Sequence, residues 1–139
     1  MKTSIFAAAA GALLLIAAPA LAKDFTPEQI IHRHMAFGAK NDARGMAGDY
    51  ADDGVILSSG QVVRGKAAIL ASATRLLGKP GGPPKMDIRA VKITSDGDVG
   101  IVFWQVPKGP HGEDAFLVRH GKILVQAVFL GATPEAPAR

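Results

Sequence analysis

Residues Asn41 to Gly78 read NDARGMAGDYADDGVILSSGQVVRGKAAILASATRLLG, and the order of turn residues and apolar runs in this stretch is the clearest structural signal in the chain. Asn41 and Asp42 predict the cap of a short helix that ends near Tyr50. The tripeptide Asp52-Asp53-Gly54 predicts a turn, because Asp and Gly favour tight turns. The short, mostly β-branched apolar run 55–57 that follows is typical of a strand.

A hairpin and a second helix are expected next. Ser59-Gly60 predicts a turn between the strand 55–57 and a second strand at Val62-Val63. Gly65 is expected to open a helix that Gly78 closes. Apolar residues recur along this helix at helical spacing, namely at Ala67, Ile69, Leu70, Ala73, Leu76 and Leu77.

The remaining sequence predicts one more helix and four strands. Thr26-Pro27-Glu28-Gln29 is a strong helix start, with a capping box between its first and last residues, and the helix is expected to run to about Lys40. The Gly- and Pro-rich segment 79–84 predicts a linker. Strands are expected at Met86 to Thr94, Val99 to Val106, Asp114 to His120 and Lys122 to Leu130. One core is expected to hold Ile69, Leu76, Ile101, Phe103 and Phe116.

This order of elements resembles the nuclear transport factor 2-like superfamily, in particular its SnoaL-like members. In those proteins an Asp-Asp turn, a hairpin and a helix start of the type Arg64-Gly65-Lys66-Ala67-Ala68-Ile69 recur in the same order. The resemblance implies an α+β fold, in which a cone-shaped, curved, mixed but mainly antiparallel sheet wraps around three helices. It implies a fold more firmly than a reaction, because this superfamily contains isomerases, cyclases, dehydratases and proteins without chemistry.

The N-terminus predicts export. Lys2 precedes an uncharged run from Phe6 to Ala18, and Ala20-Leu21-Ala22 is a small-x-small cleavage site. Residues 1–22 are therefore interpreted as a secretory signal peptide, too short for a membrane span. The expected organisation is a SnoaL-like domain at 23–131 and a disordered tail at 132–139. The mature protein is expected to be periplasmic or secreted, with no membrane attachment.

Composition excludes several classes of partner. The chain has 16 Lys and Arg residues against 12 Asp and Glu, and the basic residues are scattered without aromatic interleaving, so a nucleic-acid partner is not expected. There is no cysteine, which excludes disulfides and thiol chemistry. His32 and His34 are two apart on a predicted helix and point about 200° apart, so they cannot share a metal ion. Neither a metal nor a cofactor is expected.

Two strands are apolar on both faces. Along 99–106 both parities carry large apolar side chains, and the run 123–129 shows the same feature. In the resembling proteins one face of the sheet covers the helices and the other forms a dimer interface. We therefore expect a homodimer through the outer sheet face, and a central strand in a monomer is the alternative.

His34 and Asp114 are the candidate catalytic residues. His34 shares a helical stripe with Ile30 and Phe37, which places it toward the interior of the sheet. Asp114 shares strand parity with Phe116, and an acid beside apolar residues loses hydration, which favours its neutral form. The alternatives are a core-edge histidine with ordinary partners and an aspartate that caps a strand end in water.

The resemblance implies a role for Asp114 and also shows where this chain differs from the ketosteroid isomerases. Ketosteroid isomerases use an acid at the position of Asp114 as a hydrogen-bond donor to an enolate oxygen. Their general-base aspartate lies where this chain has Leu57-Ser58-Ser59, and their phenol lies at the position of His34. Steroid isomerisation is therefore not expected, whereas acid–base chemistry by His34 and Asp114 is possible. A small, apolar carbonyl compound is the expected ligand, bound by Met35, Tyr50, Met86, Phe103 and Phe116.

Two function classes follow from these residues. The first is an acid–base enzyme of the isomerase, cyclase or dehydratase type. The second is a ligand-binding or accessory protein of the same fold without catalysis. The missing base favours the second, and the pairing of His34 with Asp114 favours the first.

Overall fold

The computed structural model describes residues 24–131. The predicted signal peptide at 1–22 and the predicted tail at 132–139 lie outside the described residues. Within the described range, none of the helices combines the length and the apolar character that crossing a bilayer requires.

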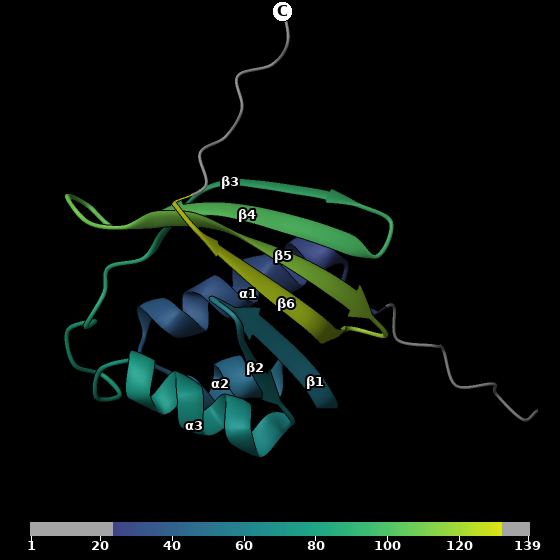
Figure 1. Ribbon diagram of the computed structural model, residues 1–139, viewed down its shortest axis with the longest axis horizontal. Helices are drawn as coiled ribbons and strands as arrows, with labels where there is room; N and C mark the ends of the chain where they lie inside the picture. Colours follow the sequence, from purple (N-terminus) through teal and green to yellow (C-terminus); the bar gives the residue numbers. More distant parts are fainter. Residues whose placement is uncertain (1–23, 132–139) are drawn as a thin grey trace, which may run out of the picture.

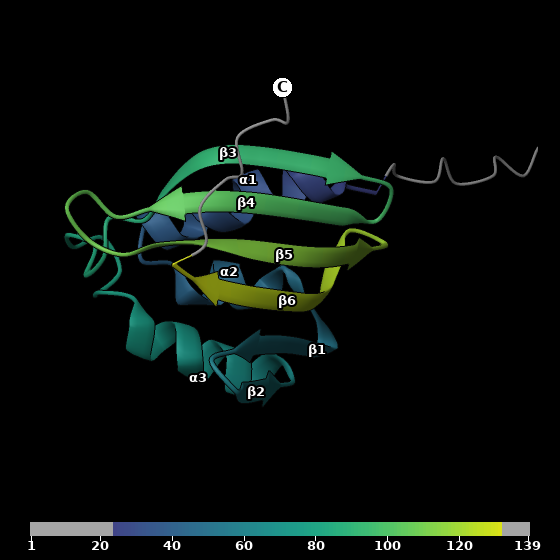
Figure 2. The same cartoon turned by 45° about the horizontal axis from the view of Figure 1, so that its top comes forward.

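A single six-stranded sheet forms one layer of the protein. Its order is β2-β1-β6-β5-β4-β3, which Figure 2 shows from one edge to the other. Only β1 and β6 pair in parallel, and the other neighbours are antiparallel. The strands are β1 (Tyr50–Ser58), β2 (Gln61–Arg64), β3 (Arg89–Asp96), β4 (Val99–Gln105), β5 (His111–Arg119) and β6 (Lys122–Leu130).

Three helices cover one side of this curved sheet (Figure 1). They are α1 (Pro27–Ala39), α2 (Ala43–Gly48) and α3 (Lys66–Leu76). The predicted capping box of α1 is confirmed, because Thr26 Oγ1 accepts from the Gln29 N–H at 3.3 Å and Gln29 Oε1 accepts from the Thr26 N–H at 3.0 Å. The prediction of an α+β fold with a mixed, mainly antiparallel sheet around three helices is confirmed.

The predicted turn at Asp52-Asp53-Gly54 is wrong, because these residues lie inside β1. The pairing of β1 with β6 shifts between Tyr50, opposite Ile123, and Val55, opposite Val125. β1 therefore has more residues than β6 over this part of the sheet, and its irregular stretch accommodates them. Asp52 and Asp53 remain exposed within it. The preceding helix, α2, ends at Gly48 with Asp49 as its C-cap, close to the end predicted near Tyr50.

Asn41 has a different role from the predicted one. Asp42 alone caps α2, accepting from the Gly45 N–H at 2.8 Å. Asn41 adopts a positive φ of 56° and is buried. Its Nδ2 donates to the carbonyls of Lys79, Gly82 and Pro83, and its Oδ1 accepts from the Gly78 N–H. This one side chain therefore holds the linker 79–84 against the turn between α1 and α2.

Two strand starts differ from the predictions. β3 begins at Arg89 rather than Met86, which leaves Met86 in the segment that enters the sheet. β5 begins at His111 rather than Asp114, because the β4–β5 connection is tight: the Val106 N–H donates to the Pro110 carbonyl at 2.8 Å. Asp114 therefore lies in the middle of a strand and not at its end.

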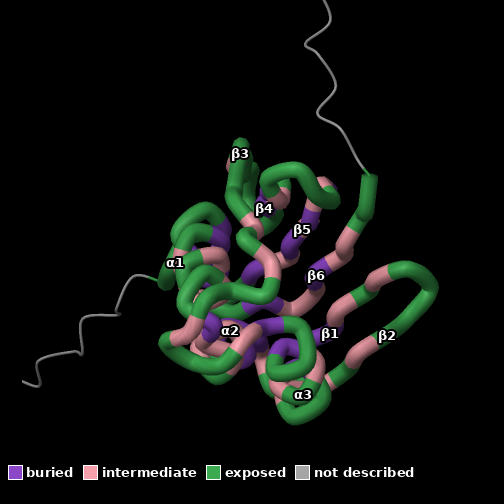
Figure 3. Tube along the Cα trace, turned by 90° about the vertical axis from the view of Figure 1, so that its left-hand side faces the viewer, coloured by how far each residue is buried: buried purple, intermediate pink, exposed green. Residues whose placement is uncertain are grey.

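The core lies between the helices and the inner face of the sheet, where Figure 3 shows the buried segments. On β4 the inward residues are Gly100, Val102 and Trp104. A Cβ at position 100 would lie 2.5 Å from Ile31 Cδ1 and 3.2 Å from Pro27 Cβ, so glycine lets α1 lie against β4 without a shift of these side chains. The central core is formed by Ile30, Ile31, Ala47, Tyr50, Ile69, Val102, Trp104, Phe116, Val118 and Ile123.

Of the five predicted core residues, Ile69 and Phe116 are confirmed. The prediction is wrong for Ile101 and Phe103, because they lie on the outer face of the sheet and are only half-buried. A strand that is apolar on both faces does not reveal which parity points inward. Leu76 is also wrong: it is 45% exposed, and Leu77 is buried instead.

Candidate functional site

His34 lies at the centre of the interior, on the inward face of α1. It is 2% exposed. Its Nδ1 lies 3.3 Å from Asp49 Oδ2. Within residues 24–131, His34 Nε2 is the one buried side-chain nitrogen or oxygen that has no hydrogen-bond partner. Buried polar groups are nearly always paired, so this nitrogen marks a candidate site.

Asp49 is the residue that closes α2 and precedes β1. Its side chain is 2% exposed, and Arg33 binds it from α1: Nε lies 2.8 Å and Nη2 2.6 Å from Asp49 Oδ1. The guanidinium of Arg33 lies over the ring of Phe25, 4.5 Å from its centroid. A chain of contacts therefore runs from Phe25 at the surface through Arg33 and Asp49 to His34.

Asp114 lies on the inward face of β5, between two strands that each supply a hydrogen-bond donor. Trp104 Nε1 on β4 donates to Oδ1 at 2.9 Å, and Gln126 Nε2 on β6 donates to Oδ2 at 2.6 Å. The hydroxyl of Tyr50 donates to Gln126 Oε1 and so fixes the orientation of the amide. Both carboxyl oxygens of Asp114 therefore accept from neutral donors.

Burial perturbs two acids in this cluster. Burial raises the pKa of the Asp114 carboxyl, while the hydrogen bonds from Trp104 and Gln126 and the charge of His34 act to lower it. Burial, together with the charges of Asp114 and Asp49, raises the pKa of the Tyr50 hydroxyl far above its ordinary value. The Tyr50 hydroxyl therefore keeps its proton and donates a hydrogen bond to Gln126 Oε1.

His34 and Asp114 share one interior but are not joined directly by any hydrogen bond among the described residues. The ring of His34 packs edge-on against Tyr50, at 5.5 Å between centroids, and against Phe116, at 5.8 Å. Tyr50 also reaches Asp114 through Gln126. The pair predicted from the sequence is thus brought together with Tyr50 and Gln126 as intermediates.

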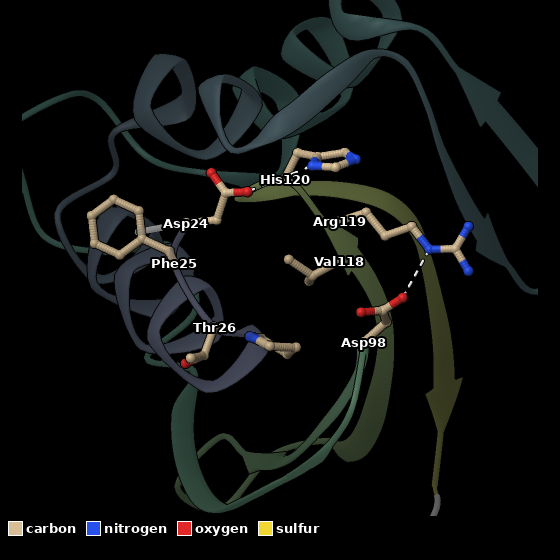
Figure 4. A pocket seen from close by; sticks show the side chains of 8 residues that line it. Asp24, Phe25, Thr26, Asp98, Val118, Arg119 and His120 are labelled. Atoms are coloured by element: carbon tan, nitrogen blue, oxygen red, sulfur yellow. Dashed lines mark hydrogen bonds and ion pairs between the residues drawn. The ribbon is translucent and has the colours of Figure 1, made fainter. Parts of the chain in front are cut away.

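Among residues 24–131, two surface hollows lie away from this cluster. One, of about 370 Å³, lies beside the N-terminus of α1 and holds the ion pairs Arg119–Asp98 and His120–Asp24 (Figure 4). The other, of about 350 Å³, lies between the β1–β2 turn and the end of β6. Neither His34 nor Asp114 is among the residues that line these two hollows.

Comparison with known proteins rests on structure. No protein-family model matches the sequence, and no curated protein matches it. An NTF-2 like protein of unknown function from Burkholderia xenovorans superposes with a TM-score of 0.62 at 20% identity, covering 78% of this chain and 84% of that one. The fold is that of the nuclear transport factor 2-like proteins.

Two further solved structures are similar to this chain to about the same extent. A protein from Catenulispora acidiphila with a ketosteroid isomerase-like fold, crystallised with trimethylamine, has a TM-score of 0.60 at 14% identity and covers 76% of this chain and 86% of its own. A protein from Sinorhizobium meliloti, provisionally named a polyketide cyclase, has a TM-score of 0.59 at 20% identity and covers 71% and 92%. At these identities the likeness establishes the fold alone.

The expected ligand-lining residues of this chain lie in different places. Tyr50 and Phe116 contact His34, and Met35 packs against the core from α1. Met86 is half-buried in the segment before β3. Phe103 is on the outer face, with its ring 6.3 Å from that of His111, so it does not face the interior that holds Asp114. Residues 24–131 contain no group of three or more potential metal ligands.

Sequence reasoning missed Arg33, Asp49, Trp104 and Gln126. One signal for Gln126 was available, because it is the single polar residue in the apolar run 123–129. A polar residue in a buried strand needs a partner, and Asp114 on the neighbouring strand supplies one. Asp49 had no such signal, because its contact with His34 depends on how α1 and α2 pack.

Proposed function

We propose that this chain is an exported acid–base enzyme that acts by proton transfer on a small, largely apolar carbonyl compound. The observation that carries the proposal is the buried, unpartnered Nε2 of His34. An imidazole nitrogen with a free lone pair in an apolar surrounding is suited to take a proton from a ligand.

The proposed reaction uses two side chains, His34 and Asp114. His34 Nε2 removes a proton from the carbon beside the carbonyl group, so a C–H bond breaks, an N–H bond forms and an enolate results. The carboxylate of Asp114, held by Trp104 and Gln126, stabilises the imidazolium that forms. Return of the same proton to another carbon completes an isomerisation. Its transfer instead to the oxygen of a β-hydroxyl group, as the C–O bond breaks and water leaves, completes a dehydration.

The alternative function is binding without catalysis. It is favoured by the hydroxyl residues Ser58 and Ser59, which stand where the resembling isomerases have a carboxylate base. The rings of Tyr50 and Phe116, which pack edge-on against His34, also favour it. In that case the same residues hold a ligand by hydrogen bonding, and nothing is turned over. The two functions make opposite predictions for solvent exchange.

Deuterium exchange tests the proposal without knowledge of the product. A panel of small cyclic ketones, enones and lactones is incubated with the protein in D₂O, and NMR measures the loss of the proton beside the carbonyl. The enzyme should accelerate exchange for at least one compound, and His34→Gln should reduce this acceleration by about 100-fold or more. His32→Gln is the matched control, because His32 is on the same helix but exposed and paired with Glu28.

Two results would contradict catalysis. His34→Gln could exchange at the wild-type rate, or no compound could exchange while some still bind. Binding is measured in parallel by thermal shift, because a ligand of the native state raises the midpoint. Trimethylamine belongs in this binding panel, since a protein of the same fold was crystallised with it.

We also propose a homodimer through the outer sheet face. The strand registers place one row of apolar side chains across five neighbouring strands, and charged side chains are absent from this row. A second copy, with the same apolar row, is the simplest partner that could cover it. The row consists of Val62, Leu57, Ala127, Ala115 and Ile101.

Light scattering coupled to gel filtration tests the dimer. Wild-type protein should have twice the mass of the chain, and Ala127→Glu should be monomeric with its fold retained. Ser72→Glu, on α3 and away from the sheet face, is the control and should remain dimeric. A monomeric wild type would contradict the proposal.

A further inference from the structure

We infer that Asp49, held by Arg33, is a positioning residue that fixes His34 in the tautomer protonated at Nδ1. The inference deepens the proposed function, on which its catalytic meaning rests, by naming the residues that prepare the base. It starts from an asymmetry: one ring nitrogen of His34 has a carboxylate partner and the other has none.

The donor and acceptor roles follow from the chemistry of Arg33. A guanidinium carries only donors, and both Nε and Nη2 point at Asp49 Oδ1, so that oxygen accepts. Asp49 is thereby held as a carboxylate, which is an acceptor at both oxygens. Its Oδ2 can only accept from His34, so His34 Nδ1 carries a proton. In a neutral imidazole the other nitrogen, Nε2, then has the free lone pair.

Asp49 is also held by its backbone. Its carbonyl accepts from the Ile123 N–H of β6 at 2.9 Å, and its own N–H donates to the Met46 carbonyl at the end of α2 at 3.2 Å. The neighbouring Gly48 carbonyl accepts from Lys122 Nζ at 2.7 Å. These contacts tie the end of α2 to the start of β6, so the carboxylate approaches His34 from a fixed direction.

This arrangement defines what the site can recognise. A lone pair on Nε2 accepts hydrogen bonds, so the ligand must present a hydroxyl, an N–H or an acidic C–H at that point. When Nε2 takes the proton, the charge of the imidazolium lies between two carboxylates, Asp49 at Nδ1 and Asp114 across the interior. Asp49 does not line the ligand side of the ring and acts only through His34, as the aspartate does in hydrolytic triads.

Nitrogen-15 NMR of the histidine rings measures the tautomer directly. The chain has four histidines, and comparison with His34→Gln assigns the signals of His34. Wild type should show a proton on Nδ1 of His34. Asp49→Asn should lose this single tautomer, because an amide can donate to Nδ1 as well as accept from it. Arg33→Gln, which removes the guanidinium fork from a partly exposed side chain, should weaken the preference.

Asp52→Asn is the matched control for charge, since Asp52 is an exposed neighbour paired with Lys66. It should leave the His34 spectrum unchanged. A wild-type His34 protonated at Nε2 alone would overturn the inference, whether or not any variant folds. An unchanged tautomer in folded Asp49→Asn would overturn it as well.

Exchange rates separate this inference from the proposed function. If both are right, Asp49→Asn lowers the exchange rate by about 100-fold or more, because the base is presented in the wrong tautomer. If wild type shows the Nδ1–H tautomer but catalyses no exchange, the positioning stands and the catalytic function fails. If exchange depends on His34 while Asp49→Asn changes neither the rate nor the tautomer, the function stands and the positioning fails.

Discussion

Trp104 on β4 and Asp114 on β5 face the same interior, and the indole Nε1 donates to Asp114 Oδ1 at 2.9 Å. Trp104→Phe keeps most of the ring and removes the donor. Loss of one of the two donors to this buried acid should lower the unfolding free energy by about 1–3 kcal/mol, which urea denaturation measures. A loss below about 0.5 kcal/mol would mean that the bond contributes little to the fold.

Asp114 should also make stability depend on pH in a definite direction. Burial raises the pKa of its carboxyl above the ordinary value of 3.8, so the folded protein binds this proton more tightly than the unfolded chain does. The stability linked to this proton is fully present below pH 3.8 and is lost as the pH rises through the raised pKa. Asp114→Asn removes the dependence.

The measurement is the difference in unfolding free energy between wild type and Asp114→Asn across this pH range. Wild type should become less stable relative to the variant as the pH rises, and the difference should level off above the raised pKa. A difference that changes in the opposite direction would show that hydrogen bonding outweighs burial at this carboxyl.

Phe116 and Ile101 should respond differently to truncation. Phe116 is in the core, so Phe116→Ala should lower the free energy of unfolding by about 3–5 kcal/mol. Ile101 is half-buried on the outer face, so Ile101→Ala should cost less than half as much at low protein concentration. Equal losses of unfolding free energy in a monomeric preparation would contradict the assignment of Ile101 to the outer face of β4.

Asn41 should be required for stability although it is far from His34. Asn41→Ala leaves several carbonyls of the linker 79–84 without a donor and places a Cβ-bearing residue at positive φ, so a loss of about 2–4 kcal/mol is expected. Asn41→Gly tolerates the backbone conformation and should lose less. If both variants unfolded at the wild-type urea concentration, the linker would not depend on this side chain.

Export is a further prediction. The mature protein should begin at Lys23, because Ala20 and Ala22 provide the small side chains that signal peptidase requires. N-terminal sequencing of protein from the periplasm or medium measures the cleavage point. Protein that retains Met1 and partitions with membranes would contradict periplasmic or secreted localisation.

Local patterns predicted the elements better than their packing. The capping box at Thr26 and the helix 66–76 are fixed by residues a few positions apart, so the sequence contains the necessary information. The inward face of β4 was not predictable in the same way, because both parities are apolar. Packing against α1 selects the parity, and this depends on Gly100 leaving room for Ile31.

The residues of the candidate site also differ in whether a local sequence pattern predicts them. His34 and Asp114 were accessible from helical spacing and strand parity, and both are buried in one interior. Asp49 and Arg33 were not accessible, because Asp49 reaches His34 only when the end of α2 meets the middle of α1. Contacts between separate elements depend on the angle at which the elements cross, which the sequence pattern does not contain.

The central claim is that His34 and Asp114 act together in proton transfer, and a double-mutant cycle on the exchange rate tests it most directly. His34→Gln and Asp114→Asn are measured singly and combined, in variants shown to be folded by circular dichroism. If Asp114 acts by stabilising the imidazolium of His34, the double variant should be no slower than His34→Gln alone, because the effects of residues that act as a unit are not additive. Losses that multiply in the double variant would contradict the account, since they would show that the two residues act independently.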